Sequence, residues 1–166
     1  MNGGSSTLQI GGTTSGTAGS FVPGTSTVIW NGSSAQTVAG FDYFNLTLAG
    51  TGAKSFTGTT RIANIFNPGS FTSGTTGTVI EFNGTAGQTI PAFNYSSLIS
   101  SNSGTRTLDP NGVIGIADAF VPGTNAYTVT GSTVSFNGGL QSIPAFTFHH
   151  LVRNSTLLNA ATMNGN

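Results

Sequence analysis

One stretch decides the fold of this chain: residues 79–93 read VIEFNGTAGQTIPAF, and close copies occur at residues 27–41 (TVIWNGSSAQTVAGF) and 133–146 (TVSFNGGLQSIPAF). Matched positions carry an aromatic residue, with spacings of 52 and then 54 residues, at Trp30, Phe82 and Phe136. A glutamine also recurs in each copy, at Gln36, Gln88 and Gln141. Self-similarity at a fixed period of this length is typical of repeat architectures such as solenoids and propellers.

A second motif, Ala-x-x-Phe-x-Pro-Gly, alternates with the first one at residues 18–24, 63–69 and 117–123. Composition does not change between parts of the chain, and no linker separates them. We therefore predict one continuous β-solenoid array over residues 1–166. Its expected repeat phases are approximately 6–24 (partial), 25–74, 75–123 and 124–166.

The composition favours strands and turns over helices. Hydrophobic residues make up 36% of the chain, 25 of its 166 residues are glycine, and only 5% are charged. No stretch long enough for a helix combines helical apolar spacing with freedom from Gly and Pro. In the first repeat the expected strands are residues 27–30, 36–38, 44–48, 54–56, 61–65 and 69–72.

Three short strands per coil would make each repeat of about 52 residues equal to about two coils. We therefore predict an all-β fold, a parallel β-helix built from about three such repeats. An antiparallel sandwich stays open as the alternative, because Asn-Gly between two strands is also a hairpin signature.

Several side chains have expected places in such a β-helix. Asn31, Asn83 and Asn137 are expected to adopt positive φ and, with the glycine that follows each, to turn corners. Phe66 and Phe120 are expected in the core. Leucines occupy one matched position of the three repeats, and all three side chains are expected to point inward: Leu46, Leu98 and Leu151.

Charge and cysteine content exclude several classes of function. Four basic residues cannot form a patch that neutralises several phosphates, so nucleic acid is not an expected partner. Without cysteine the chain has no disulfide, no thiolate zinc ligand and no thiol nucleophile. No apolar run reaches the ~20 residues of a membrane helix, so membrane insertion is not expected either.

The remaining ionisable groups are too few and too scattered to predict an active site. Asp42, Glu81, Asp109 and Asp118 are expected to be isolated surface or turn carboxylates, with Asp109 bonding turn amides. Adjacent strand residues point to opposite faces, so His149 and His150 are not expected to hold one metal ion. We predict no catalytic, cofactor-binding or metal-ligating residue, no cofactor and no enzymatic activity.

Residues 77–90 (GTVIEFNGTAGQTI), residues 93–98 (FNYSSL) and residues 52–56 (GAKSF) together carry a family resemblance. They resemble repeats of very large secreted surface proteins of Gram-negative bacteria, in the style of filamentous-haemagglutinin-like adhesins. The resemblance implies a right-handed β-helix exported to the cell exterior, and it brings no catalytic motif.

The expected function is that of a secreted, cell-surface structural or adhesive module that forms a fibre or a stalk. Neither residues 5–11 nor residues 154–166 contain a helix, a charged cluster or a proline-rich plug that could cap a solenoid. Expected partners are therefore further copies of the chain end to end or adjoining repeats of a longer chain. Cell-surface glycans and solid surfaces are further candidates.

Two alternative functions stay open. Ice binding would use an outward Thr-rich face, for which the chain offers the pairs Thr25/Thr27, Thr57/Thr59, Thr105/Thr107 and Thr128/Thr130. Carbohydrate binding or polysaccharide cleavage along the side of the rod would use exposed rings as stacking platforms, at Tyr43, Tyr95 or Tyr127.

Overall fold

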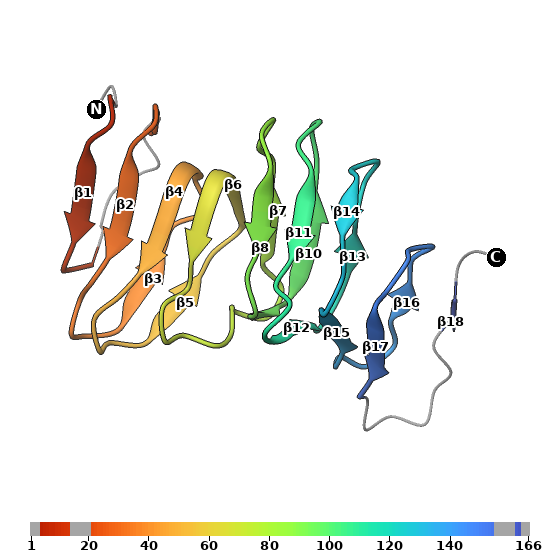
Figure 1. The fold of residues 1–166 in the computed structure, drawn as a ribbon. Coiled ribbons are helices and arrows are strands. Elements are labelled where there is room, and N and C mark those ends of the chain that lie inside the picture. The colour runs from red at the N-terminus through yellow and green to blue at the C-terminus, as the bar shows by residue number, and fades with distance from the viewer. Residues whose placement is uncertain (1–3, 14–20, 155–161, 164–166) are drawn as a thin grey trace.

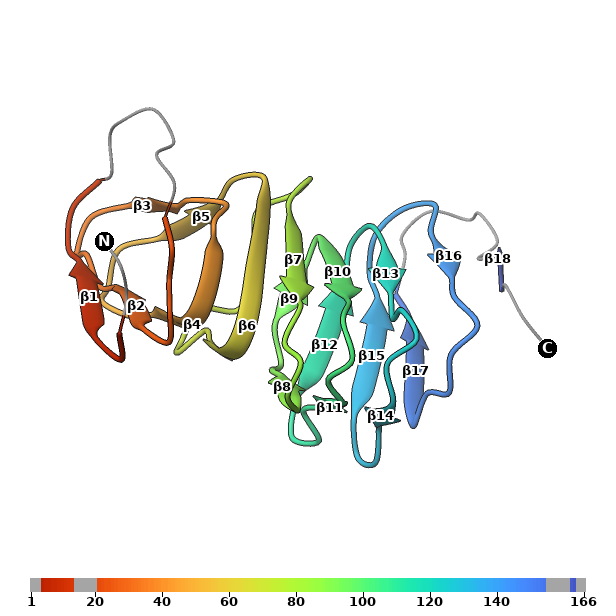
Figure 2. The same cartoon turned by 90° about the horizontal axis from the view of Figure 1, so that it is seen from above.

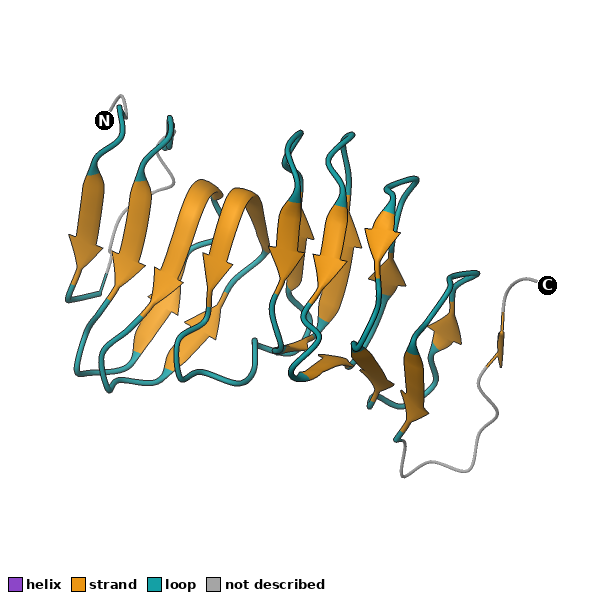
Figure 3. Cartoon of the chain, viewed as in Figure 1, coloured by secondary structure: helices purple, strands orange, loops and turns teal. Residues whose placement is uncertain are grey.

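The computed structural model describes residues 4–13, 21–154 and 162–163, and every regular element in them is a strand (Figure 3). In chain order the strands are β1 (Thr7–Ile10), β2 (Thr27–Trp30), β3 (Gln36–Val38), β4 (Asp42–Leu48), β5 (Lys54–Phe56), β6 (Thr59–Asn67), β7 (Val79–Phe82), β8 (Gln88–Ile90), β9 (Asn94–Tyr95), β10 (Ser97–Ser100), β11 (Arg106–Leu108), β12 (Val113–Ile116), β13 (Phe120–Val121), β14 (Tyr127–Thr128), β15 (Thr133–Phe136), β16 (Ser142–Ile143), β17 (His150–Arg153) and β18 (Thr162–Met163). The strand expected at residues 69–72 does not form, and nearby only Ser73 makes an isolated parallel bridge, to Asn94.

The strands stack coil upon coil in parallel sheets. One sheet has the order β1-β2-β4-β6-β7-β10-β13, a second β17-β15-β12-β9 and a third β14-β11-β8, and two further sheets have two strands each. Every strand pairing in the described residues is parallel. The coils follow one another from the N-terminal to the C-terminal end (Figures 1 and 2). The all-β class and the parallel β-helix are thereby confirmed, and the antiparallel sandwich is excluded.

The strand registers give the length of one coil. Paired residues are 17 to 22 positions apart, as in Thr133↔His150 and Leu98↔Phe120, and the chain makes about seven turns. A repeat of 52 to 54 residues therefore spans between two and three coils, more than the two expected. As a result the repeated motif begins on different sheets: β2 and β7 belong to the seven-stranded sheet, whereas β15 belongs to the four-stranded one.

The core runs along the axis and is made of aliphatic and aromatic side chains. Leu46, Leu98, Phe66 and Phe120 are buried, as predicted. Leu151 differs, because 38% of it is exposed although it pairs with the buried Val134. Pairing with Val134 places the Leu151 side chain toward the core, but no described residue covers it on the side away from β15. The prediction was therefore wrong about burial at this last coil.

The glutamine of the repeated motif fastens one coil to the previous one. The Oε1 of Gln88 accepts a hydrogen bond from the Gly84 N–H at 2.7 Å, which holds its own corner. Its Nε2 donates to the carbonyls of Ile62 and Asn64 in the coil before, at 2.9 and 3.0 Å. The same pattern holds for Gln36 and Gln141.

The Asn-Gly corners are built differently from the prediction. Among the described non-glycine residues only Asn102 has positive φ, so Asn31, Asn83 and Asn137 do not. Their glycines are needed for space: a Cβ on Gly84 would lie 2.2 Å from the carbonyl oxygen of Ala63 in the preceding coil. The corner is tight because the glutamine draws the two coils together.

Candidate functional site

Three of the chain's four basic residues donate hydrogen bonds to backbone carbonyls at the corners of the coils. The Nη2 of Arg106, a fully buried side chain, donates to the carbonyls of Phe82, Gly84 and Ser101 at 2.9, 3.1 and 2.6 Å. Burial lowers the pKa of this guanidinium. Lys54 and Arg153 donate to corner carbonyls in the same way.

These cations extend the role of the repeated glutamines. Each one follows a motif glutamine, in the pairs Gln36/Lys54, Gln88/Arg106 and Gln141/Arg153. Each also binds a carbonyl of the corner that its glutamine closes. This role was not predicted, although a basic residue 12 or 18 positions after each motif glutamine is a signal for it in the sequence. The arrangement leaves little positive charge for binding an anionic partner.

The acidic residues do not assemble a reaction centre. Asp42 and Glu81 each form an ion pair with Arg61, with N···O distances of 3.4 and 3.0 Å. The prediction that these two carboxylates are isolated was therefore wrong. Asp109 accepts from the N–H of Asn111 at 2.8 Å, which confirms its expected turn role. Asp118 accepts from the Ser97 hydroxyl. No group of three His, Asp or Glu side chains that could hold a metal ion occurs in the described part of the chain.

The two histidines lie side by side instead of on opposite faces. The rings of His149 and His150 pack edge to face with centroids 4.2 Å apart, and both residues are exposed. The expected opposite orientation was wrong, because His149 precedes β17 and is outside the ladder that begins at His150. Within the described residues the pair has no third ligand candidate.

Two of the three tyrosines are structural. Tyr43 and Tyr95 are 2% and 1% exposed, and their hydroxyls donate to the carbonyls of Ala39 and Pro91. Neither ring can serve as a stacking platform for a sugar, so the alternative of carbohydrate binding loses both. Tyr127 is half-buried and does line a groove, described below.

These tyrosines predict a pH dependence of stability. Burial raises the pKa of both phenols above the ordinary value of about 10, so the folded chain keeps protons that the unfolded chain loses. The stabilising contribution of the two buried, protonated phenols is complete below about pH 10 and is lost as the pH rises further. We expect the free energy of unfolding, measured with urea, to fall above about pH 10.

The matched control is the double variant Tyr43→Phe/Tyr95→Phe, which copies Phe148 at the same position of the third repeat. It should show a clearly shallower alkaline fall than the parent chain. Equal slopes for the two proteins would contradict this account.

Among the described residues, the N-terminal end of the core is open. A pocket of about 150 Å³ lies there, lined among others by Leu8, Ile10, Phe21 and Trp30. β1 is the first strand of its sheet, and the carbonyls of Ser6, just before it, and of Ile10 accept from the N–H groups of Thr27 and Asn31. Since successive residues of a strand face opposite ways, the N–H and C=O of Gln9 point away from β2. No described strand pairs with that edge.

The C-terminal end has the same character. Leu151, inward in register, and Val152 are 38% and 41% exposed. Among the described residues β17 pairs with β15 alone, although β16 in the same coil pairs with β18 of the next one. Within the described part of the chain, β1 and β17 therefore each have a free strand edge beside apolar side chains.

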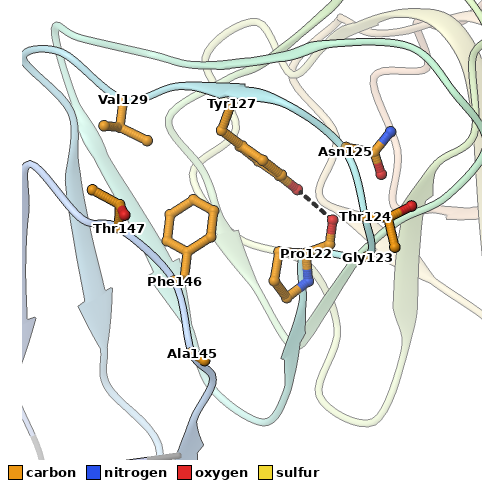
Figure 4. A pocket seen from close by; sticks show the side chains of 9 residues that line it. All are labelled: Pro122, Gly123, Thr124, Asn125, Tyr127, Val129, Ala145, Phe146 and Thr147. Carbon is orange, nitrogen blue, oxygen red and sulfur yellow. Dashed lines mark hydrogen bonds between the residues drawn. The ribbon is translucent and has the colours of Figure 1, made fainter. Parts of the chain in front are cut away.

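A groove of about 570 Å³ separates β14 from residues 145–147 (Figure 4). Tyr127 and Phe146 both line it, and their rings pack edge to face with centroids 4.8 Å apart. Two of its polar side chains are engaged by the chain itself: the Asn125 amide donates to the carbonyls of Asn102 and Gly104, and the Tyr127 hydroxyl donates to Ser100.

The threonine pairs do not form one flat array. Thr27 lies on β2, Thr59 on β6, Thr107 on β11 and Thr128 on β14, and the third and fourth of these strands are in a different sheet from the first two. Of these eight threonines only Thr107 and Thr128 are direct neighbours in one ladder, and ice binding stays a prediction.

Comparison of the chain with protein-family models, with curated proteins and with solved structures yields no match. The resemblance to filamentous-haemagglutinin-like repeats thus stays a prediction carried by the repeat residues. The described residues contain no helix with the length and hydropathy needed to cross a membrane.

Proposed function

We propose that this chain is a non-enzymatic, extracellular structural or adhesive β-solenoid module that forms part of a fibre or a stalk. In this role its two ends stack on further coils, either those of a second copy or those of adjoining repeats in a longer surface protein. The filamentous-haemagglutinin-like character of the repeats supports the proposed location at the bacterial cell surface.

The observation that carries this proposal is the exposure of inward-facing apolar residues at the ends. Leu46 and Leu98 are completely buried between coils, whereas Leu151 at the matched position is 38% exposed. At the other end, Leu8 and Ile10 line an open apolar pocket beside the free edge of β1. An additional coil on either end would cover these side chains and pair the free backbone groups.

The charge distribution is compatible with such stacking. The formal net charge is zero, and Lys54, Arg106 and Arg153 are bound to backbone carbonyls. Two ends of the same chain can therefore approach each other without long-range repulsion. A head-to-tail contact of this kind does not close on itself and gives a filament.

The test is a substitution that blocks the free edge of β1. We expect the weight-average mass of the parent chain, measured by sedimentation equilibrium, to rise with protein concentration. Gln9→Pro removes an N–H that faces away from β2, so it spares the β1–β2 ladder and prevents pairing on the other side. This variant should stay a monomer at concentrations where the parent associates.

Gln9→Thr is the matched control. It loses the same hydrogen bond between Asn31 and the Gln9 side chain but keeps the backbone N–H, so it should associate like the parent. A parent chain that remains monomeric at millimolar concentration, or a Gln9→Pro variant that associates as well as Gln9→Thr, would overturn the proposal.

A further inference from the structure

Three paired segments of the chain share one pattern, in which a threonine lies between two residues whose side chains face the core. They are Gln88-Thr89-Ile90, Arg106-Thr107-Leu108 and Tyr127-Thr128-Val129, and Thr89 pairs with Thr107 and Thr107 with Thr128. Residues 146–148, Phe-Thr-Phe, repeat the pattern one coil later, 19 positions after Tyr127. The sequence register thus places Thr147 next to Thr128 in a fourth rung.

The structure does not form this rung. The sheet ends at β14, and the groove of about 570 Å³ separates β14 from residues 145–147. On the neighbouring side of the solenoid the seven-stranded sheet ends at β13. There a second groove of about 420 Å³ lies between residues 118–121 and residues 140–144.

The third side of the solenoid stays continuous. β12, β15 and β17 pair in register, so the last coil is joined to the others through one sheet (Figure 1). The corner after β15 also stays attached, because the Gln141 amide donates to the carbonyls of Ile116 and Asp118 at 2.9 and 3.0 Å. The separation is therefore confined to the segment from residue 142 to residue 149.

The backbone of β14 is prepared to receive a partner strand. The carbonyl of Ala126 accepts from the Arg106 N–H and so faces β11. The N–H and C=O of Tyr127 therefore face the groove. The ring of Phe146 also lies at the groove, with its centroid 4.8 Å from the ring centroid of Tyr127 and 5.1 Å from that of Phe120.

We propose that residues 142–148 form a strap with two positions, of which the structure shows the open one. In the closed position residues 146–148 pair with β14 and place Thr147 beside Thr128. Residues 142–143, which already pair with β18, gain β13 as a second neighbour. The four-stranded sheet acts as the hinge. Closure fills both grooves and completes the backbone ladders on all three sides of the last coil.

Disulfide trapping tests the closed position, and the absence of cysteine from the chain makes the experiment clean. In the double variant Thr128→Cys/Thr147→Cys, closure brings the two Cα atoms to the separation of neighbouring strands, about 5 Å, which suits a disulfide. We expect this pair to oxidise in the native protein at least tenfold faster than the negative control pair.

Two other pairs serve as controls. Thr107→Cys/Thr128→Cys joins strands that already pair and should oxidise readily. Thr107→Cys/Thr147→Cys is two coils apart even after closure, about 10 Å, and should stay reduced. If the Thr128/Thr147 pair oxidises no faster than the Thr107/Thr147 pair, the strap does not close and the proposal is overturned.

Hydrogen exchange of the unsubstituted chain provides a second readout that needs no variant. The Tyr127 amide, which faces the groove, should exchange at least tenfold more slowly than an unprotected amide if the strap closes. Exchange at the unprotected rate would contradict closure independently of the oxidation result.

Discussion

Replacing Arg106 by methionine is expected to lower the free energy of unfolding by about 3 kcal/mol. The guanidinium is fully buried and donates to the carbonyls of Phe82, Gly84 and Ser101. Hydrogen bonds to charged groups contribute more than neutral ones. Methionine fills much of the same volume and offers no donor, so these bonds are lost together. Urea unfolding followed by circular dichroism measures the change.

Arg61→Met is the matched control, because Arg61 is the same residue type on the outside. Its side chain is 46% exposed, and of its two ion-pair partners Asp42 is 61% exposed and Glu81 17%. Exposed pairs contribute about 0–1 kcal/mol, so the expected loss is below about 1 kcal/mol.

A third variant separates charge from packing. Arg106→Lys keeps a cation at the corner, as Lys54 does in the first repeat, and should recover part of the stability. If Arg106→Met and Arg61→Met are equally stable, the buried cation is not fastening the coils.

Gly84→Ala is expected to cost a similar amount, about 3 kcal/mol, for a steric reason. An added Cβ would lie 2.2 Å from the carbonyl oxygen of Ala63 and 2.8 Å from the side chain of Gln88. The carbonyl is backbone in the preceding coil, so the coils must separate to accommodate a methyl group. When the coils separate, the hydrogen bonds from the Gln88 amide to the carbonyls of Ile62 and Asn64 lengthen. Thermal and urea unfolding of the purified variant measure the loss.

Gly87→Ala is the control within the same corner. Its nearest neighbour is the Thr105 hydroxyl at 3.0 Å, a side-chain atom that can rotate away, and its φ is not positive. Its stability should stay within about 1 kcal/mol of the parent. A Gly84→Ala variant as stable as Gly87→Ala would show that the corner is not closely packed.

At the candidate sites, local sequence patterns predicted some features, whereas contacts between residues far apart in the sequence could not be predicted. Inspection of residue types predicted the turn role of Asp109, because an aspartate bonds amides within its own turn. It could not predict that Asp42 and Glu81 lie on either side of Arg61, because these residues come from three different coils. Nor could it show that Tyr43 and Tyr95 are buried while Tyr127 borders a groove.

The sequence alone determined the all-β class and the three repeats, and it favoured parallel winding over the antiparallel sandwich that the strand pairing later excluded. These properties follow from local information: β-branched and hydroxyl residues favour strands, and a period of about 52 residues requires units that stack. The burial of Leu46, Leu98, Phe66 and Phe120 also followed from the repeat alignment.

Only the tertiary structure decided what lies across from what. The coil length of 17 to 22 residues sets which side chains meet, and it does not divide the repeat into whole coils. The reach of Gln88 and Arg106 to carbonyls of an earlier coil, and the separation of residues 145–147 from β14, depend on that offset. The physical reason is that contacts between coils join residues about twenty positions apart, where no local preference acts.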